Sequence, residues 1–143
     1  ACAWTGRTIA SMRVWDTLRA LAALRLMPGL GHAPVSLAAR GEAAAVVLYS
    51  ALLAGDVENV FLQSPPSTQY SPSQKDGRGP AIEMLYCLRI TDLPHIAGLL
   101  FPARLILAGA SPDCYGWAEG IYRRLGAPER FERLSDLRQW KRT

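Results

Sequence analysis

The chain has 143 residues, of which 50% are hydrophobic, and carries a formal net charge of +4 at pH 7. This length and composition are typical of one globular domain and exclude a disordered protein. Charge or proline interrupts every apolar stretch well before the ~20 residues needed to cross a bilayer, so we expect no membrane span.

Basic residues crowd the end of the chain. We interpret them as a solvated surface, because no helix-turn-helix, zinc finger or RNA-binding strand motif accompanies them. The sequence therefore favours a protein without a nucleic-acid partner, and nucleic-acid binding stays as a minor alternative. The basic residues are Arg123, Arg124, Arg130, Arg133, Arg138, Lys141 and Arg142.

The first predicted element is an amphipathic helix over residues 9–26, because apolar side chains recur there at three- and four-residue spacing. Pro28 and Gly29 end it, since proline lacks the amide donor and glycine suits a left-handed cap. The apolar positions are Ile9, Met12, Trp15, Leu18, Leu21, Ala22 and Leu26.

A strand, a tight turn and a second helix follow. Residues 34–39 form a short extended run, the turn lies at Gly41, and an apolar helix occupies residues 42–53. Residues 57–63 are predicted to be the next strand, which ends at a Ser-Pro-Pro sequence. This order is typical of an α/β fold.

The next segment is rich in Ser, Pro, Gln and Gly. Residues 64–80 follow neither helical nor strand periodicity, so we predict a long flexible loop there. Residues 82–100 are helical in pieces, with a break expected at Pro94.

The last elements are a strand at residues 104–108, a helix at 115–125 and a short strand at 131–134. Alternating strands and helices favour parallel pairing with right-handed crossovers. We therefore predict one α/β domain over residues 1–143, a three-layer sandwich around a mostly parallel sheet. Three or four strands are few for such a sheet, so we expect it to be incomplete.

Five segments resemble, in order, successive parts of bacterial α/β-hydrolases. The resemblance is to the carboxylesterases similar to acetylxylan esterase and dienelactone hydrolase. It covers nearly the whole chain but corresponds only to the C-terminal half of that fold, and the order and spacing of the segments carry it. The segments are residues 13–20, 39–43, 89–94, 101–108 and 125–131.

This resemblance implies a nucleophile turn at residues 39–43. The family's turn reads G-x-S-x-G and exposes a serine between a strand and a helix. Here Gly41 occupies the serine position, so the nucleophile position is degenerate. Small residues at Ala39 and Ala43 keep the turn buildable, and Glu42 suits the positive end of the following helix.

The other two members of a catalytic triad are also in doubt. Asp113 lies at or within one residue of the family's acid position, and it is either a remnant of that acid or an ordinary turn residue. The family's histidine should follow the last strand, but residues 135–143 contain none. His32 and His95 do not match that position, and we expect both to be solvent-facing or locally hydrogen-bonded.

The sequence contains no strong signal for other chemistry. Cys2, Cys87 and Cys114 are odd in number and lack C-x-x-C spacing, which favours idle thiols over zinc ligands or a disulfide framework. Cys114 beside Asp113 is a weak candidate nucleophile. We expect no cofactor and no metal, because Gly-rich phosphate loops and clustered metal ligands are absent from the sequence.

Two functions remain open. The first is a catalytically inactive α/β-hydrolase-like domain that acts as a structural or assembly subunit, with a homo- or hetero-oligomeric partner covering an open sheet edge. The alternative is an acetyl or short-acyl ester hydrolase completed by a partner chain or by an N-terminal half. The resemblance allows a secreted, periplasmic or cytoplasmic protein, so it does not fix the compartment.

Overall fold

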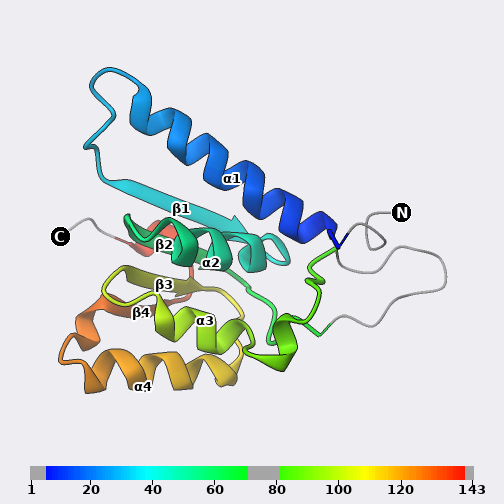
Figure 1. Ribbon diagram of the computed structural model, residues 1–143. Helices are drawn as coiled ribbons and strands as arrows, with labels where there is room; N and C mark the ends of the chain where they lie inside the picture. The colour runs from blue at the N-terminus through cyan, green and yellow to red at the C-terminus, as the bar shows by residue number, and fades with distance from the viewer. Residues whose placement is uncertain (1–5, 71–80, 141–143) are drawn as a thin grey trace.

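Four parallel strands form a single sheet in the computed structural model, which describes residues 6–70 and 81–140 (Figure 1). The strand order is β1-β2-β3-β4, so each strand pairs with its neighbours in sequence. This arrangement confirms the predicted α/β class and the small, incomplete parallel sheet. The strands are β1 (Val35–Arg40), β2 (Val57–Gln63), β3 (Arg104–Ala108) and β4 (Phe131–Leu134).

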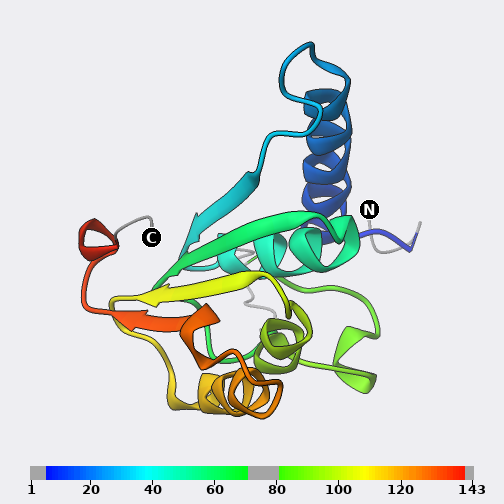
Figure 2. The same ribbon diagram turned by 90° about the vertical axis from the view of Figure 1, so that its left-hand side faces the viewer.

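The helices that connect the strands lie on one side of the sheet. Right-handed crossovers that all step in the same direction place their helices on the same face. Figure 2 shows this arrangement, with only the C-terminal turn η5 on the opposite side. The helices are α1 (Ile9–Leu26), α2 (Ala43–Ala54), α3 (Leu93–Leu99) and α4 (Gly116–Arg124), and the 3-10 turns are η2 (Cys87–Arg89), η3 (Asp113–Tyr115), η4 (Pro128–Arg130) and η5 (Leu137–Gln139).

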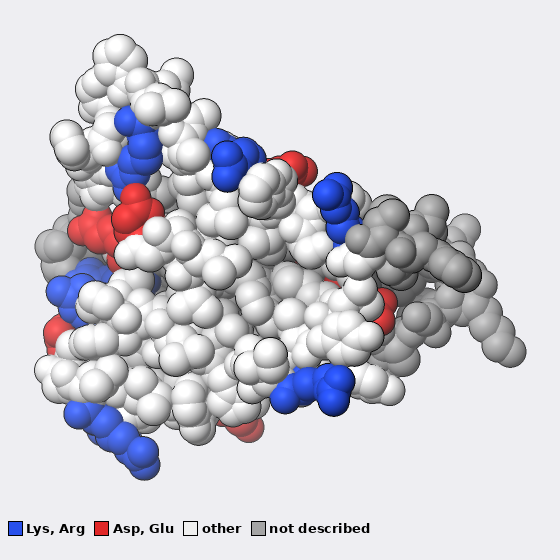
Figure 3. Space-filling model, in the orientation of Figure 1, with Lys and Arg blue, Asp and Glu red and all other residues white. Residues whose placement is uncertain are grey.

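The core lies between this helical layer and the sheet. Leu62, Leu105 and Leu107 point toward the helices and are fully buried in the main apolar cluster. The middle helix, α2, carries no charged residue. The centre of this face shows no charged side chain among the described residues, and arginine side chains lie toward its margins (Figure 3).

The opposite face of the sheet, called the far face below, is more open. On β1 the side chains of Ser36, Ala38 and Arg40 point to this face and are exposed. Trp140 folds back onto Phe61 of β2, with ring centroids 4.9 Å apart. Among the described residues, this C-terminal segment is what represents the third layer of the predicted sandwich.

Helix α1 has the predicted bounds, but the apolar stripe taken from the sequence matches its buried face only in part. The buried residues are Ala10, Val14 and Leu21, whereas Trp15 is 57% exposed and Leu26 is 86% exposed. The reason is that α1 packs mainly on α2 and does not lie across the sheet. A helix with one packing partner buries a narrow stripe, so its larger apolar side chains stay in solvent.

The prediction that Pro94 breaks a helix is wrong. Pro94 lies in the first turn of α3. Backbone N–H groups in the first turn have no intrahelical acceptor, so the N–H that proline lacks is not needed there. Asp92 caps this helix by accepting a hydrogen bond from the backbone N–H of Leu93 at 2.7 Å. The Asp-Leu-Pro sequence is therefore a helix start.

Part of the predicted flexible loop is tightly held. Residues 64–70 have no helix or strand, but the Tyr115 hydroxyl donates to the carbonyl of Pro66 at 3.0 Å, and Gln69 is only 2% exposed. Residues 71–80 lie outside the described part, so the predicted flexibility there is untested.

In residues 6–70 and 81–140, every helix is too short or too polar to span a bilayer.

Candidate functional site

Three strands end in the same way at the carboxyl edge of the sheet, where parallel α/β sheets commonly bind ligands. The residue that follows each strand has a positive φ and donates its backbone N–H to the last carbonyl of the next strand. These residues are Gly41 (φ 57°, to Gln63 at 2.8 Å), Ser64 (φ 49°, to Ala108 at 2.9 Å) and Gly109 (φ 70°, to Leu134 at 3.1 Å).

Gly41 lies at the predicted turn between β1 and α2. A β-carbon added there would meet nothing within 4 Å, so a side chain on this residue would have open space. The positive φ is the conformation that a nucleophile turn requires and that glycine adopts without strain. Glu42 occupies the N-cap position of α2, but its side chain makes no capping hydrogen bond. The turn has a suitable shape without a reactive group.

Ser64 is the residue that sequence reasoning missed. Its positive φ is uncommon for a residue other than glycine, and such outliers concentrate at functional sites. Its hydroxyl oxygen would lie 3.0 Å from a β-carbon on Gly109, a tight contact that adds to the preference for glycine set by the φ of 70° at that position. The Ser-Pro-Pro sequence marks a turn but does not reveal this backbone conformation.

Asp113 begins the turn η3 after β3, as the sequence predicted. Its carboxylate is exposed and makes no hydrogen bond with the described residues. His32 is exposed in the loop that precedes β1, at the amino end of the strands. His95 is exposed on α3 with its ring 4.8 Å from that of Trp117. Neither histidine is hydrogen-bonded to Asp113. The described residues therefore do not form the acid–histidine pair of a catalytic triad.

The two cysteines in the described part of the chain are free thiols. Cys114 contacts the carbonyl of Ser67 at 3.4 Å, and partial burial raises the pKa of its thiol above the ordinary value. A thiol with a raised pKa holds its proton at pH 7 and is a poor nucleophile. Cys114 is therefore a weak catalytic candidate, and Cys2 lies outside the described residues.

A buried hydrogen-bond network beneath the loop also escaped sequence reasoning. The Tyr49 hydroxyl donates to Oε1 of Gln69 at 2.7 Å, and Nε2 of Gln69 donates to the Ile82 carbonyl at 3.0 Å. Asp92 accepts from the backbone N–H of Gln69 at 2.7 Å and from the Thr68 hydroxyl. Burial raises the pKa of Tyr49 well above its ordinary range, so the phenol stays a donor. This network fixes the start of the loop against the helices.

Several arginines near the C-terminus are engaged locally. Arg123 and Arg133 both lie within salt-bridge distance of Glu119, at 3.3 and 3.4 Å, and Arg130 donates to the Pro102 carbonyl at 2.8 Å. These contacts agree with a solvated surface. Lys141 and Arg142, which belong to the same basic group, lie outside the described residues.

Within the described ranges, there is no group of three or more His, Cys, Asp or Glu side chains placed to hold an ion. Comparison of the chain with known protein families, with curated proteins and with solved structures finds no match. Functional inference therefore depends on the geometry described above.

Proposed function

We propose that this chain is a non-catalytic α/β-hydrolase-like domain that acts as a structural or assembly subunit. Gly41 carries the proposal. The turn after β1 has the positive φ and the open space of a nucleophile turn, yet it presents only a hydrogen atom. Without a nucleophile, the backbone donors near this turn have no covalent step to assist.

The positions of the other polar groups support the same proposal. A hydrolase triad needs a base within hydrogen-bond reach of the nucleophile and a third group that orients the base. Here Asp113 makes no hydrogen bond with described residues, and His95 packs against Trp117. The acid and the base therefore do not form a pair. The site thus lacks this pair in addition to the nucleophile missing at Gly41.

The assembly role follows from the open edge of the sheet. Strand β1 pairs only with β2, so its outer backbone edge has no strand partner among the described residues. Helix α1 packs mainly on α2 beside this edge and exposes Trp15 and Leu26. Open strand edges flanked by apolar side chains are surfaces that proteins cover by pairing. A second copy or another chain would supply the cover.

An esterase assay tests the non-catalytic role directly. We expect the purified protein neither to hydrolyse p-nitrophenyl acetate above the blank rate nor to bind a fluorophosphonate covalently. Gly41→Ser should leave both results unchanged, because a hydroxyl alone lacks a base. Inhibitable turnover by the unmodified protein would overturn the proposal.

Ser64 keeps ester hydrolysis as the second candidate. It is a hydroxyl-bearing residue at the next strand exit, with the same left-handed backbone as Gly41. If the protein were labelled by a fluorophosphonate, Ser64→Ala should abolish the label while Gly41→Ala should not. Peptide mapping of the labelled residue would decide between Ser64 and any other nucleophile.

The assembly role has a separate test. Native mass spectrometry of the particle isolated from its source should find the chain in complexes larger than one copy, either with itself or with another chain. A strictly monomeric particle at all concentrations would contradict an assembly role, whatever the esterase assay shows.

A further inference from the structure

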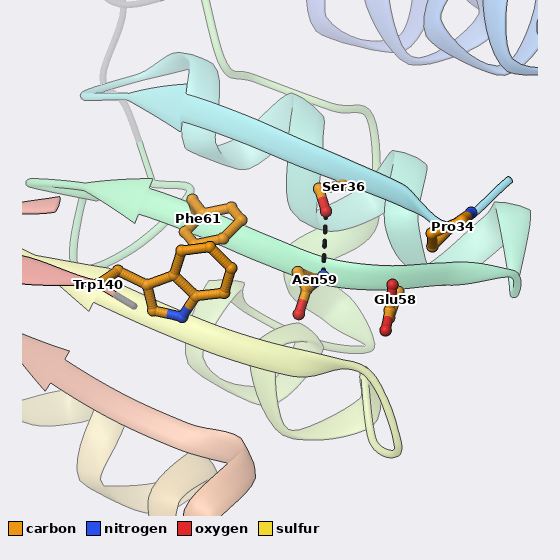
Figure 4. Close-up of a pocket in the computed structure, with 6 residues that line it drawn as sticks. All are labelled: Pro34, Ser36, Glu58, Asn59, Phe61 and Trp140. Carbon is orange, nitrogen blue, oxygen red and sulfur yellow. Dashed lines mark hydrogen bonds between the residues drawn. The ribbon is translucent and has the colours of Figure 1, made fainter. Parts of the chain in front are cut away.

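A groove of about 290 Å³ lies on the far face of the sheet, near the amino ends of β1 and β2. One side chain comes from the residue before β1, one from β1, three from β2 and one from the C-terminal segment. Figure 4 shows aromatic rings at one end, a hydroxyl–amide pair in the middle and a carboxylate at the other end. The lining residues are Pro34, Ser36, Glu58, Asn59, Phe61 and Trp140.

Glu58 is the one charged side chain among the described residues that line this groove. It is exposed and forms no ion pair or hydrogen bond with another described residue. Arg104 is next to Asn59 in the sheet, but its guanidinium lies 3.9 Å from Glu132, so part of its charge is already compensated. The groove therefore has a free negative charge at one end.

The middle of the groove adds hydrogen-bond acceptors. Nδ2 of Asn59 donates to the hydroxyl oxygen of Ser36 at 3.0 Å. That contact uses one amide N–H and leaves the amide oxygen of Asn59 as an acceptor. A ligand with several N–H donors can use both this oxygen and the Glu58 carboxylate.

Phe61 and Trp140 close the other end. Their rings meet edge to face at 82°, an arrangement that keeps one ring face available for contact. The indole N–H of Trp140 is buried without a hydrogen-bond partner among the described residues. This end of the groove therefore contains an unsatisfied hydrogen-bond donor. Aromatic faces attract both apolar chains and organic cations.

We propose that this groove binds a guanidinium or primary ammonium group carried on an apolar stem. The cation contacts Glu58 and the amide oxygen of Asn59, and the stem lies along Phe61 toward Trp140. Glu58 and Phe61 are three positions apart on a strand, which separates the two ends by about 10 Å. That span suits a cation on a flexible carbon chain, such as an arginine or lysine side chain, and not a compact ammonium ion.

This site goes beyond the proposed assembly role and does not depend on it. It uses the far face near the amino ends of the strands, whereas Gly41 is at the carboxyl edge. The cation has two possible sources, a free amine or the basic side chain of a chain lying along the open edge of β1. Both share the same chemistry, and the experiment distinguishes them.

The test is a titration of the whole 143-residue protein followed by the tryptophan indole N–H signals in NMR. The probes are Nα-acetyl-arginine amide and its uncharged analogue Nα-acetyl-norleucine amide. We expect the arginine probe to shift the Trp140 signal saturably, with a Kd of about 1 mM because one cation and a short stem form few contacts. The norleucine probe should bind at least about tenfold more weakly.

Two variants make the test specific. Glu58→Gln should raise the Kd of the arginine probe about fivefold or more, because it removes the carboxylate that the cation contacts. Glu129→Gln, at an exposed carboxylate on η4, is the matched control and should leave the Kd unchanged. An unchanged melting temperature for both variants shows that a loss of binding is not a loss of folding.

The possible results are separable. A missing Trp140 shift, equal binding of the two probes, or an equal effect of Glu58→Gln and Glu129→Gln would each overturn the cation site. An extended peptide with one arginine between valines serves as the second arm. Tighter binding than the arginine probe, together with shifts of the β1 amides, assigns the cation to a chain on the open edge. Equal affinity assigns it to free amines, and neither result bears on the esterase assay.

Discussion

The two faces of the sheet are built from the same strands but differ in chemistry. On the helical face, Leu105 and Leu107 are fully buried in one continuous cluster. On the far face, Ser36 and Arg40 are exposed, and Trp140 packs on Phe61 where no helix covers the sheet in the described part of the chain. The helical face thus holds the fold together, whereas the part of the far face formed by β1 is exposed among the described residues. Substitutions on the two faces should therefore have very different consequences.

The largest effect is expected in the helical-face core. Leu105→Ala should lower the free energy of unfolding by about 3 kcal/mol, because it removes buried methyl groups and leaves a cavity. Ala38→Lys, on the exposed far face of β1, should change it by less than about 0.5 kcal/mol. Urea denaturation of both variants measures the contrast. Equal losses would show that the far face is packed as tightly as the helical face.

The loop network should give the next largest effect. Asp92→Ala removes the N-cap of α3 and the acceptor for Thr68 and Gln69. We expect a loss of about 2 kcal/mol, since a helix cap and a buried partner are removed together. Asp136→Ala, which removes only the cap of the exposed turn η5, is the control and should have a smaller effect. Equal losses of unfolding free energy in the two variants, measured by urea denaturation, would contradict the role of the network.

Tyr122 gives a prediction that depends on pH. Its hydroxyl donates to the Ala103 carbonyl at 2.8 Å, and burial raises its pKa well above the ordinary value of 10.0. Tyr122→Phe should cost about 1 kcal/mol at pH 7. Above pH 10 the unfolded chain releases the phenolic proton while the folded chain retains it, so the unmodified protein loses stability that the variant keeps. The difference in unfolding free energy should therefore shrink as the pH rises above 10, and a constant difference would contradict it.

The smallest effect on stability is expected at the Gly41 turn after β1. Gly41→Ala places a β-carbon on a residue with φ 57°, which should destabilise the protein by about 1 kcal/mol despite the open space around it. Gly120→Ala, in helix α4 where a β-carbon also meets nothing within 4 Å, should stabilise by about 0.5–1 kcal/mol. Opposite shifts in melting temperature would show that the turn depends on backbone conformation and not on space.

Much of the fold could be predicted from the sequence because its signals are local. The bounds of α1, β2, β3 and β4 agree with the expected ranges, since alternation and turn residues mark them. The buried stripe of α1 was not predictable in the same way. It is set by packing against α2, a contact between elements that no spacing within α1 encodes.

The candidate site was likewise predictable from the sequence only in part. The turn at Gly41 was locatable because a strand, small residues and a helix follow one another in the sequence. The left-handed backbone of Ser64 was not, because the Ser-Pro-Pro sequence marks a turn without specifying its dihedral angles. The network around Gln69 joins residues more than ten positions apart, and a polar loop sequence gives no sign of such burial. Catalytic competence, which depends on distances between elements, stays outside what the sequence predicts.

The strand order has a consequence for how the chain folds. Since each strand pairs with the strand next in sequence, the sheet can grow in the order in which a ribosome releases its strands. Each of β2, β3 and β4 pairs with a strand that precedes it in the sequence. The pairings are parallel and each needs a crossover; residues 64–103 form the crossover from β2 to β3, which is longer than the other two. The spatial order of the four described strands therefore follows their order in the sequence, with β1 and β4 at the two edges of the sheet.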